Sequence, residues 1–486
     1  MKRFLAMSRT KRIFVSILSV ILVYIVYVII GATLPFIGSP EVSQEYKNNF
    51  DIHNFYSDSV GVDRATVVET SQDALDVRLH MIEQAEVELA ISSFSIKADR
   101  SSQEIASAIY AAANRGVKVK IIVDGLTGFI DMKDDPIYYV LGTHPNVEIR
   151  YYNMVDLLKP WTINGRLHDK YFLVDHKLLL LGGRNISDYF LGEYNPSALS
   201  YDRDILVFNT AFDSKDNIQS VIYETWDYFY TIWDCEYSEV VFDHVKSSKT
   251  KKVSDAKVKL ETTYATLKDT RPDIFSSIDY TTITVPTNKI TLISNPIHIM
   301  TKQPYLWYNL TQLMRSAKER IYIQTPYAVL NNDMYKELST INTLVPQFDM
   351  LINSRAGGDN FCASSDYTFN QKKILKTGIN LHEFQGNYSM HDKSLLIDHD
   401  IAIIGSYNLD MRSTYLDTEV MLVVNGSEFN QQLEGYFDQM LSQSLPVKSD
   451  GSYGSNGNVT PLPMSTGKKM LFSISSVFFQ LFRYLL

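Results

Sequence analysis

Two short stretches of the chain carry the residue types that phosphoryl chemistry needs, and their spacings match. Each stretch reads His-x-Lys-x4-Asp and is followed by Gly-[Gly/Ser]-x-Asn: His168, Lys170, Asp175, Gly183 and Asn185 in the first, and His391, Lys393, Asp398, Ser406 and Asn408 in the second. Counterparts differ by a constant 391 − 168 = 223 positions. One such match carries little information, but two in register indicate an internal repeat.

A pair of imidazoles from equivalent places predicts a site between two halves of the molecule. Exchange at a phosphodiester by a covalent route needs one imidazole to attack phosphorus and another to protonate the leaving oxygen. The second imidazole then deprotonates the incoming alcohol. Histidine suits both tasks because it titrates near neutral pH. The candidates are His168 and His391.

The remaining residues of the repeat predict how the phosphate is held. Lys170 and Lys393, together with the amides of Asn185 and Asn408, can stabilise the non-bridging oxygens of a five-coordinate transition state. Gly183 lets the backbone approach a ligand, and Ser406 offers a hydroxyl in the equivalent position. Asp175 and Asp398 are candidates for a catalytic role and equally for a structural one.

Acidic residues after each stretch could orient the imidazoles. Asp202 or Asp204 follows the first stretch and Asp417 or Glu419 the second, as matching Asp-x-[Asp/Glu] pairs, and we favour Asp204 and Glu419. The first pair lies (202 − 185) − (417 − 408) = 8 residues further from its Asn, which predicts an insertion. Because a lysine two positions from each histidine would repel a cation, we predict no metal and no cofactor.

The segments around these residues indicate α/β architecture. Val87–Ser95 and Val117–Val123 are predicted strands, and the Ala-rich segment Ile105–Arg115 between them is a predicted helix. Apolar strands Tyr171–Val174 and Leu178–Leu181 flank Asp175, which places His168 and Lys170 at the start of a strand. The second half repeats this plan, with predicted strands at Ile321–Gln324, Asp349–Asn353 and Glu419–Val424.

Composition limits the class of protein. The chain has 486 residues, enough for two or three domains, and a formal charge of −9. Residues 1–30 carry five basic residues and no acid, so the remainder is near −9 − 5 = −14. An acidic body argues against nucleic-acid binding. The two cysteines, Cys235 and Cys362, are too few for a zinc framework; buried free thiols are one interpretation and a single disulfide the other.

The N-terminal region predicts a membrane anchor. Ile13–Ile30 contains no charged residue and follows Lys2, Arg3, Arg9, Lys11 and Arg12. This length spans a bilayer, and the basic flank predicts a cytoplasmic N-terminus with the body on the other side. A cleaved signal peptide is the alternative, although no clear cleavage site follows Ile30.

Two further segments have more than one interpretation. Residues 246–260 are rich in lysine, which predicts a solvated linker or a contact with anionic lipid headgroups. Residues 449–467 predict a flexible tail. Met470–Leu486 has a polar stripe on an otherwise apolar helix, Ser473, Ser476, Gln480 and Arg483, and fits either a helix packed into the core or an interfacial membrane helix.

At its two signatures the chain resembles the phospholipase D superfamily over roughly residues 65–445. The run Gly405–Ser413 followed by Leu416-Asp417-Thr418-Glu419 is similar to the second motif of bacterial cardiolipin synthases, although Gly183 stands where serine is commoner in the first. The resemblance implies a monomeric unit with two pseudo-symmetric α-β-α sandwich lobes in one chain and the site at their interface. It also implies a phosphohistidine on His168, with His391 as acid and base.

The predicted organisation is a basic flank and anchor at 1–35, a connector at 36–64, a first lobe at 65–245, a linker at 246–290, a second lobe at 291–445 and a tail with a C-terminal helix at 446–486. The favoured function is membrane-bound transfer of a phosphatidyl group from phosphatidylglycerol to a phospholipid alcohol. The alternatives are phospholipase D-type hydrolysis, in which water is the acceptor, and a non-catalytic membrane-tethered binding protein. The predicted partners are membrane phospholipids.

Overall fold

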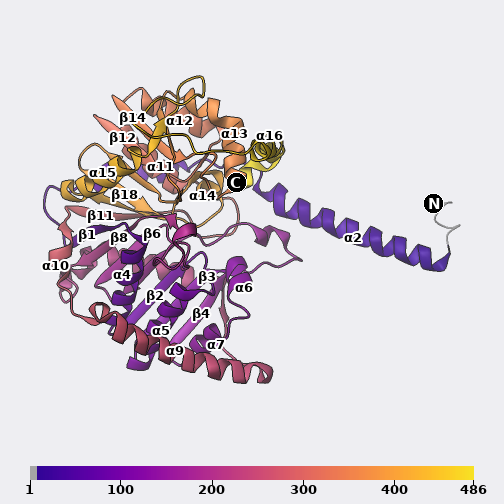
Figure 1. Ribbon diagram of the computed structural model, residues 1–486, viewed down its shortest axis with the longest axis vertical. Coiled ribbons are helices and arrows are strands. Elements are labelled where there is room, and N and C mark those ends of the chain that lie inside the picture. The colour runs from indigo at the N-terminus through magenta and orange to yellow at the C-terminus, as the bar shows by residue number, and fades with distance from the viewer. Residues whose placement is uncertain (1–7) are drawn as a thin grey trace.

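The computed structural model describes residues 8–486, so Lys2 and Arg3 of the basic flank lie outside the described residues. Helix α2 spans Arg9–Thr33, and the hydroxyl of the preceding residue Ser8 caps its N-terminus. None of its side chains is buried. The helix projects from the body as a single arm (Figure 1). Its length and apolar composition are sufficient to cross a membrane.

The first lobe contains a mixed nine-stranded sheet in the order β10-β1-β8-β6-β5-β2-β3-β4-β9, in which β2, β3 and β4 are parallel. Helices α4 (Ser71–Gln84), α5 (Arg100–Arg115) and α7 (Pro136–Gly142) pack with it around one core. The strands are β1 (Asp63–Val68), β2 (Glu88–Ser93), β3 (Lys118–Asp124), β4 (Val147–Tyr152), β5 (Tyr171–Val174), β6 (Leu178–Gly182), β8 (Asp204–Asn209), β9 (Ser238–Val241) and β10 (Val285–Pro286).

The second lobe repeats this plan in an eight-stranded sheet, with the order β11-β20-β18-β17-β12-β14-β15-β21. Helices α11 (Tyr305–Arg315), α12 (Asn332–Asn342) and α13 (Phe361–Leu375) pack with this sheet. The strands are β11 (Lys289–Ser294), β12 (Arg320–Gln324), β14 (Gln347–Asn353), β15 (Asn380–Phe384), β17 (Ser394–Ile397), β18 (Ile401–Gly405), β20 (Val420–Asn425) and β21 (Ser444–Pro446).

A third core joins the two lobes. Strands β6 and β8 of the first sheet contact β18 and β20 of the second. Helices α8 (Val221–Trp233) and α15 (Ser427–Leu441) contribute large apolar side chains to the same core, among them Trp226, Phe229 and Phe437. Because this core takes residues from both sheets, the lobes form one packed body, and the predicted α/β fold with two pseudo-symmetric lobes is confirmed.

The lysine-rich segment between the lobes contains a helix that its composition does not predict. Helix α9 (Thr250–Thr270) packs on α5 and α7 (Figure 1). Its buried residues are Ala256, Leu260 and Leu267, with helical spacing, while Lys251, Lys252, Lys257 and Lys259 are exposed. The predicted linker thus contains a helix with an exposed lysine-rich face, because three buried side chains in one stripe are enough to hold an otherwise polar helix against the first lobe.

The C-terminal region, for which the composition predicts a flexible tail, makes specific contacts with the second lobe. The Asn456 amide donates to the carbonyl oxygens of Leu441 and Ser444, at 3.0 and 2.8 Å. The Leu462 amide donates to Gln385. Helix α16 (Thr466–Phe479) and the short helix η8 (Gln480–Leu485) follow, and α16 packs on α13.

Candidate active site

The two signature histidines lie at the seam between the lobes, each at the start of a strand. His168 precedes β5 and His391 precedes β17. The chain around each one pairs with the opposite lobe, because Leu167 bridges to Thr418 and Met390 pairs with Tyr201. The His391 backbone amide donates to the Tyr201 carbonyl oxygen at 2.6 Å. The repeat therefore brings both histidines into one interface between the lobes.

Each imidazole is held by an acid from the other lobe. His168 Nδ1 lies 2.8 Å from Glu419 Oε1, and His391 Nδ1 lies 2.6 Å from Asp202 Oδ2. Both acids are fully buried, whereas the histidine side chains remain 13 % and 12 % exposed. With Nδ1 occupied by a carboxylate, Nε2 of each ring is the nitrogen that can meet a substrate, and at His391 it also lies 3.4 Å from Lys393 Nζ. The sequence offers the correct acids among its candidates, but it does not predict this crossed arrangement.

Asp202 takes the position predicted for Asp204. The Gly183 amide donates to the Arg203 carbonyl oxygen, as the Ser406 amide does to that of Val420, so Asp202 is the counterpart of Glu419. The difference in spacing from Asn is therefore (202 − 185) − (419 − 408) = 6 residues, not eight. The similar Asp-x-[Asp/Glu] pairs gave a false alignment, displaced by two residues.

Asp204 serves a different cluster. Its Oδ2 accepts from Arg78 Nη1 at 2.9 Å and from Arg184 Nη1 at 3.1 Å. All three side chains are buried. The Asp204 carboxylate therefore pairs with two guanidinium groups at the first residue of β8 and has no contact with an imidazole.

Gly183 and Ser406 lie against the two acids that hold the imidazoles, Asp202 and Glu419. A Cβ atom on Gly183 would lie 2.3 Å from Asp202 Oδ1, so only glycine leaves room for this carboxylate. In the equivalent position Ser406 Oγ donates to Glu419 Oε2 at 2.5 Å. Both residues therefore contact the acids that hold the imidazoles, while the phosphate contact expected of each stays a prediction.

The two lysines lie beside the imidazoles and are almost completely buried. Lys170 Nζ donates to the His168 carbonyl oxygen, and Lys393 Nζ donates to that of His391. Lys393 Nζ also lies 3.8 Å from Asp202. Burial lowers the pKa of Lys170 to about 7, despite the nearby Glu419, and burial also lowers the pKa of Lys393. An anionic substrate would raise both values again by stabilising the charged amines.

Electrostatics distinguish the two histidines. Burial and then the charge of Lys170 lower the pKa of His168 well below its ordinary value. Burial and Lys393 also lower the pKa of His391, but Asp202 opposes them. Asp202 is itself ionised, because Lys393 and His391 overcome its burial and lower its pKa to about 2. Burial raises the pKa of Glu419 well above its usual range. His391 therefore has the stronger anionic support for a proton.

The two asparagines of the repeat occupy equivalent places, Asn185 just after β6 and Asn408 just after β18. Asn408 is buried, and Asn185 is half-buried. Among the described residues, neither Asn185 Oδ1 nor Asn408 Oδ1 has a hydrogen-bond partner. These two buried amide oxygens are therefore available to accept a hydrogen bond from a donor group of a ligand.

Asp175 and Asp398 lie at the far ends of their strands, away from the imidazoles. Asp175 accepts from the backbone amides of residues 86–88, and Asp398 from those of residues 318–320, at 2.8–3.2 Å. Both residues have a φ of 50°. A carboxylate that accepts from three backbone amides holds a turn in place, so these contacts favour the structural one of the two roles considered for each residue.

Two aromatic side chains of the site were not predicted. The Phe94 ring centroid lies 5.2 Å from that of His168, and the Phe190 centroid lies 5.1 Å from that of His391. Phe190 follows the first signature closely, but Phe94 comes from the loop after β2 and has no signal in the sequence. The rings form an apolar wall on each side of the two imidazoles.

Two lobes that share crossed His–acid pairs at their seam define a phospholipase D-type enzyme. The family model described as "Cardiolipin synthase, PLD-like domain" matches residues 79–213 and 310–441, and the chain belongs to this family. It is therefore an enzyme of the phosphatidyltransferase class in that superfamily.

Known proteins are similar along most of the chain. Cardiolipin synthase C of Escherichia coli (strain K12) is 28% identical over 412 residues, which cover 76% of this chain and 83% of the relative. Cardiolipin synthase 1 of Bacillus anthracis is 24% identical over 373 residues, with 76% and 65% covered. The crystal structure of phosphatidylserine synthase from Haemophilus influenzae Rd KW20 superposes with a TM-score of 0.64 at 14% identity, covering 91% of this chain and 99% of that chain, and thus shares the fold.

Proposed function

We propose that the protein transfers a phosphatidyl group from phosphatidylglycerol to the glycerol hydroxyl of a second phospholipid and so forms cardiolipin. The observation that carries the proposal is the pair of crossed contacts, His168 with Glu419 and His391 with Asp202. Each contact fixes one ring and directs Nε2 away from its acid. Two such nitrogens at one seam supply the nucleophile and the acid that a two-step exchange requires.

In the first step His168 Nε2 attacks phosphorus and an N–P bond forms. The P–O bond to the glycerol headgroup breaks, and the proton on His391 Nε2 passes to the departing oxygen. In the second step His391 accepts the proton of the incoming hydroxyl, whose oxygen attacks phosphorus while the N–P bond breaks. Overall, two molecules of phosphatidylglycerol give one molecule of cardiolipin and one of glycerol. We expect the Nδ2 groups of Asn185 and Asn408 and the ammonium groups of Lys170 and Lys393 to donate to the non-bridging oxygens.

The difference between the histidines supports these roles. A nucleophilic imidazole must be neutral, and the pKa of His168 is the one held well below its ordinary value by burial and Lys170. A general acid must carry a proton, and ionised Asp202 favours the protonated form of His391. The family resemblance implies the same order.

The apolar helix α2 supports attachment of the enzyme to the membrane that holds its substrates. Arg9, Lys11 and Arg12 at its start favour a cytoplasmic N-terminus. The catalytic body would then lie on the opposite side. A membrane-impermeant biotin reagent added to intact cells should label lysines of the body if this orientation is correct. Labelling only after cell lysis would contradict it.

Labelled phosphatidylglycerol tests the reaction. The detergent-solubilised full chain is incubated with phosphatidylglycerol alone and with phosphatidylethanolamine added, and the products are identified. Cardiolipin with release of glycerol is the expected result. Phosphatidic acid as the sole product would establish hydrolysis instead, and no product from either lipid would contradict catalysis. His168→Ala serves as the inactive control.

A phosphodiester with a p-nitrophenol leaving group separates the roles of the histidines. This leaving group departs without protonation, so His391→Ala should retain a first-turnover burst of p-nitrophenolate, whereas His168→Ala should give none. The opposite pattern would exchange the two roles.

A further inference from the structure

Helix α16 has its polarity reversed relative to an ordinary surface helix. Three polar residues of α16 and of η8, which continues it, face the protein: Ser475 Oγ lies 2.9 Å from Ser365 Oγ, Gln480 donates to Asp366 Oδ1 at 3.0 Å, and Arg483 Nε donates to the same oxygen at 2.6 Å. The apolar residues point outward and are 53–68 % exposed: Met470, Leu471, Ile474, Val477, Phe478 and Leu481. An amphipathic helix in water normally buries the apolar face, so this face lacks its partner.

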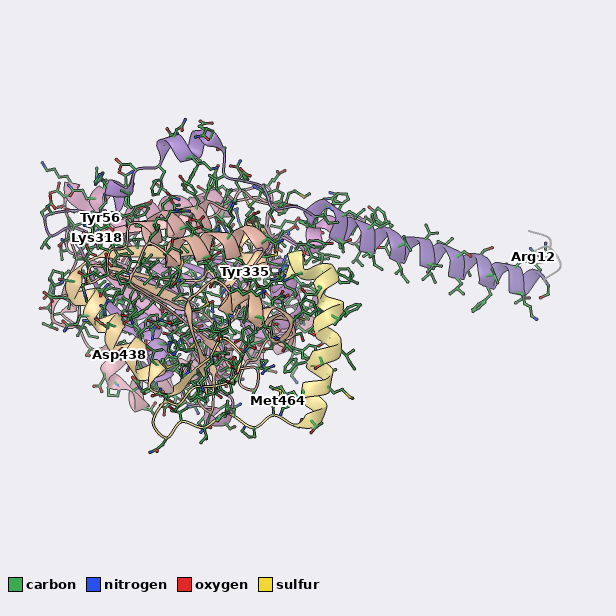
Figure 2. The ribbon with its side chains drawn as sticks, turned by 90° about the horizontal axis from the view of Figure 1, so that it is seen from above. Arg12, Tyr56, Lys318, Tyr335, Asp438 and Met464 are labelled. Carbon is green, nitrogen blue, oxygen red and sulfur yellow. The ribbon has the colours of Figure 1, made fainter. Side chains whose placement is uncertain are left out.

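The helix η8 that continues α16 packs against Phe36 of η1 (Leu34–Phe36), the short turn that directly follows α2. Tyr484 and Leu485 contact the cluster of Phe36, Met411, Tyr415 and Leu416. The Arg412 amide also donates to the Leu486 carbonyl oxygen at 2.8 Å. In Figure 2, α16 lies on the side of the body from which α2 leaves, and it runs across the direction of α2. A helix in this position lies in the plane of any bilayer that α2 crosses.

A second apolar element lies beside α2 itself. Leu157 and Leu158 are 57 % and 74 % exposed, and their carbonyl oxygens accept from the hydroxyls of Tyr24 and Tyr27 at 2.9 and 2.6 Å. Tyr24 and Tyr27 lie six and three residues before Ile30, the last residue of the uncharged run. At about 1.5 Å per residue these positions are about 9 and 5 Å inside that end, the depth typical of interfacial segments.

A third apolar element is α6 (Gly125–Asp131), which lies on the same side of the first lobe in Figure 1. Its residues Phe129 and Ile130 are 45 % and 64 % exposed. The Lys133 ammonium lies 4.1 Å from the centre of the Phe129 ring. Lysines also accompany the other two elements, with Lys159 next to Leu158 and Lys468 and Lys469 just before Met470. Basic residues beside apolar ones complement anionic lipid headgroups, although the body as a whole is acidic.

We propose that these three elements, the outward face of α16, Leu157–Leu158 and Phe129–Ile130, form one docking surface that rests on the headgroup–acyl boundary of the bilayer that α2 enters. Two of the three elements contact α2 or the residue Phe36 just after it. Because α2 enters a bilayer, we take the bilayer as the partner that covers this surface. The arrangement differs from attachment by α2 alone, because it fixes the orientation of the body on the membrane.

The docking surface is connected to both walls of the active site. Thr127 of α6 donates to the Phe94 carbonyl oxygen, and the Phe94 ring contacts His168. On the other side Phe472 of α16 stacks on Phe361 at 5.3 Å. Two residues before Phe361, Asp359 accepts from Tyr189, whose ring contacts Phe190 beside His391. Under the proposed function, docking brings the seam that holds the partly exposed imidazoles to the level of lipid phosphates.

The first test measures depth and does not depend on activity. Full-length protein with Cys235→Ser, Cys362→Ser and Ile474→Cys is labelled with an environment-sensitive fluorophore and reconstituted into vesicles of phosphatidylethanolamine and phosphatidylglycerol. A blue shift and quenching by lipids with a nitroxide near the headgroup are expected. The matched control is Val258→Cys on α9, which is 60 % exposed but outside the docking surface and should remain unquenched.

Equal quenching at positions 474 and 258, or none at 474, would overturn the proposal. A blue shift at 474 that persists in dilute detergent, without quenching by lipid but with a doubled mass of the protein, would identify a second copy of the chain as the occupant and also overturn it.

The second test compares substrate presented in vesicles with substrate in micelles. The triple variant Ile474→Ser, Val477→Ser, Leu481→Ser should retain its melting temperature and its turnover in mixed micelles but lose turnover on vesicles. The matched control, Ile218→Ser, Val258→Ser, Leu344→Ser, removes the same side-chain types from exposed positions elsewhere and should be unchanged in both. Equal turnover on vesicles for the two triple variants would contradict docking through α16. Absence of any turnover in wild type would instead contradict the proposed function and leave the quenching result standing.

Discussion

Glu419 Oε1 lies 2.8 Å from His168 Nδ1, although the two residues are 251 positions apart and belong to different lobes. The second contact, between Asp202 and His391, crosses the seam in the opposite direction. Each imidazole therefore depends on the lobe that does not contain it.

Loss of either acid should impair catalysis without unfolding the protein. We expect Glu419→Gln and Asp202→Asn each to reduce kcat roughly 10²- to 10⁴-fold, because the amide no longer stabilises the correct tautomer or an imidazolium. With the p-nitrophenyl substrate the defect of Asp202→Asn should shrink, because His391 need not donate a proton, while that of Glu419→Gln should persist. Equal defects with both substrates would argue that the acids have only a structural role.

The pH dependence of kcat/KM should reflect the low pKa of His168. Burial and Lys170 hold this pKa well below 6.5, so neutral His168 persists to lower pH and the acid limb should lie below pH 6.5. Lys170→Met removes a positive charge, which raises the pKa of His168 and should move that limb to higher pH. The conservative variant Lys170→Arg keeps the charge and should leave the limb in place. A limb at the same pH in Lys170→Met would contradict the assignment.

Gly183 should not tolerate the serine found at the equivalent position of the second lobe. In Gly183→Ser the new Cβ would lie 2.3 Å from Asp202 Oδ1, so the carboxylate must move and release His391. We expect a loss in kcat of roughly 10²-fold or more, comparable with Asp202→Asn. The matched change Ser406→Gly removes only a hydroxyl that donates to Glu419 and should cost roughly 10-fold or less. Steady-state kinetics of the pair check the prediction, which fails if Gly183→Ser is as active as wild type.

Asp175 should affect stability and not the chemical step. Asp175→Ala leaves three backbone amides without an acceptor, which should lower the free energy of unfolding by roughly 1–3 kcal/mol. Asp175→Asn keeps an oxygen and tolerates the positive φ, so it should lose less. Urea unfolding measures both variants, and kcat per folded molecule should match wild type. A large fall in kcat with unchanged unfolding would return Asp175 to the catalytic residues.

The sequence predicts the fold and the two histidines well because both depend on local patterns. Buried strands such as Tyr171–Val174 are continuous apolar runs, and the repeat has a fixed spacing. The crossed pairs depend on tertiary contacts that no local pattern encodes. The alignment of Asp202 with Asp417 failed because an insertion between Asn185 and β8 changes length without leaving a compositional mark.

The C-terminal helix shows a different limit. Its polar stripe is visible in the sequence, but the stripe alone does not say which face meets the protein. Asp366 decides this, because a fully buried carboxylate requires Gln480 and Arg483 as partners. That acid lies 117 positions from Arg483 and has no sequence signal of its role.

The strand bridges at Leu167–Thr418 and Met390–Tyr201 also limit how the enzyme can move during turnover. A hinge that separated the lobes would break both bridges and dismantle both halves of the catalytic apparatus in one motion. We therefore expect lipid exchange to proceed without separation of the lobes, so the rate of the cycle should not depend on opening and closing of the two halves.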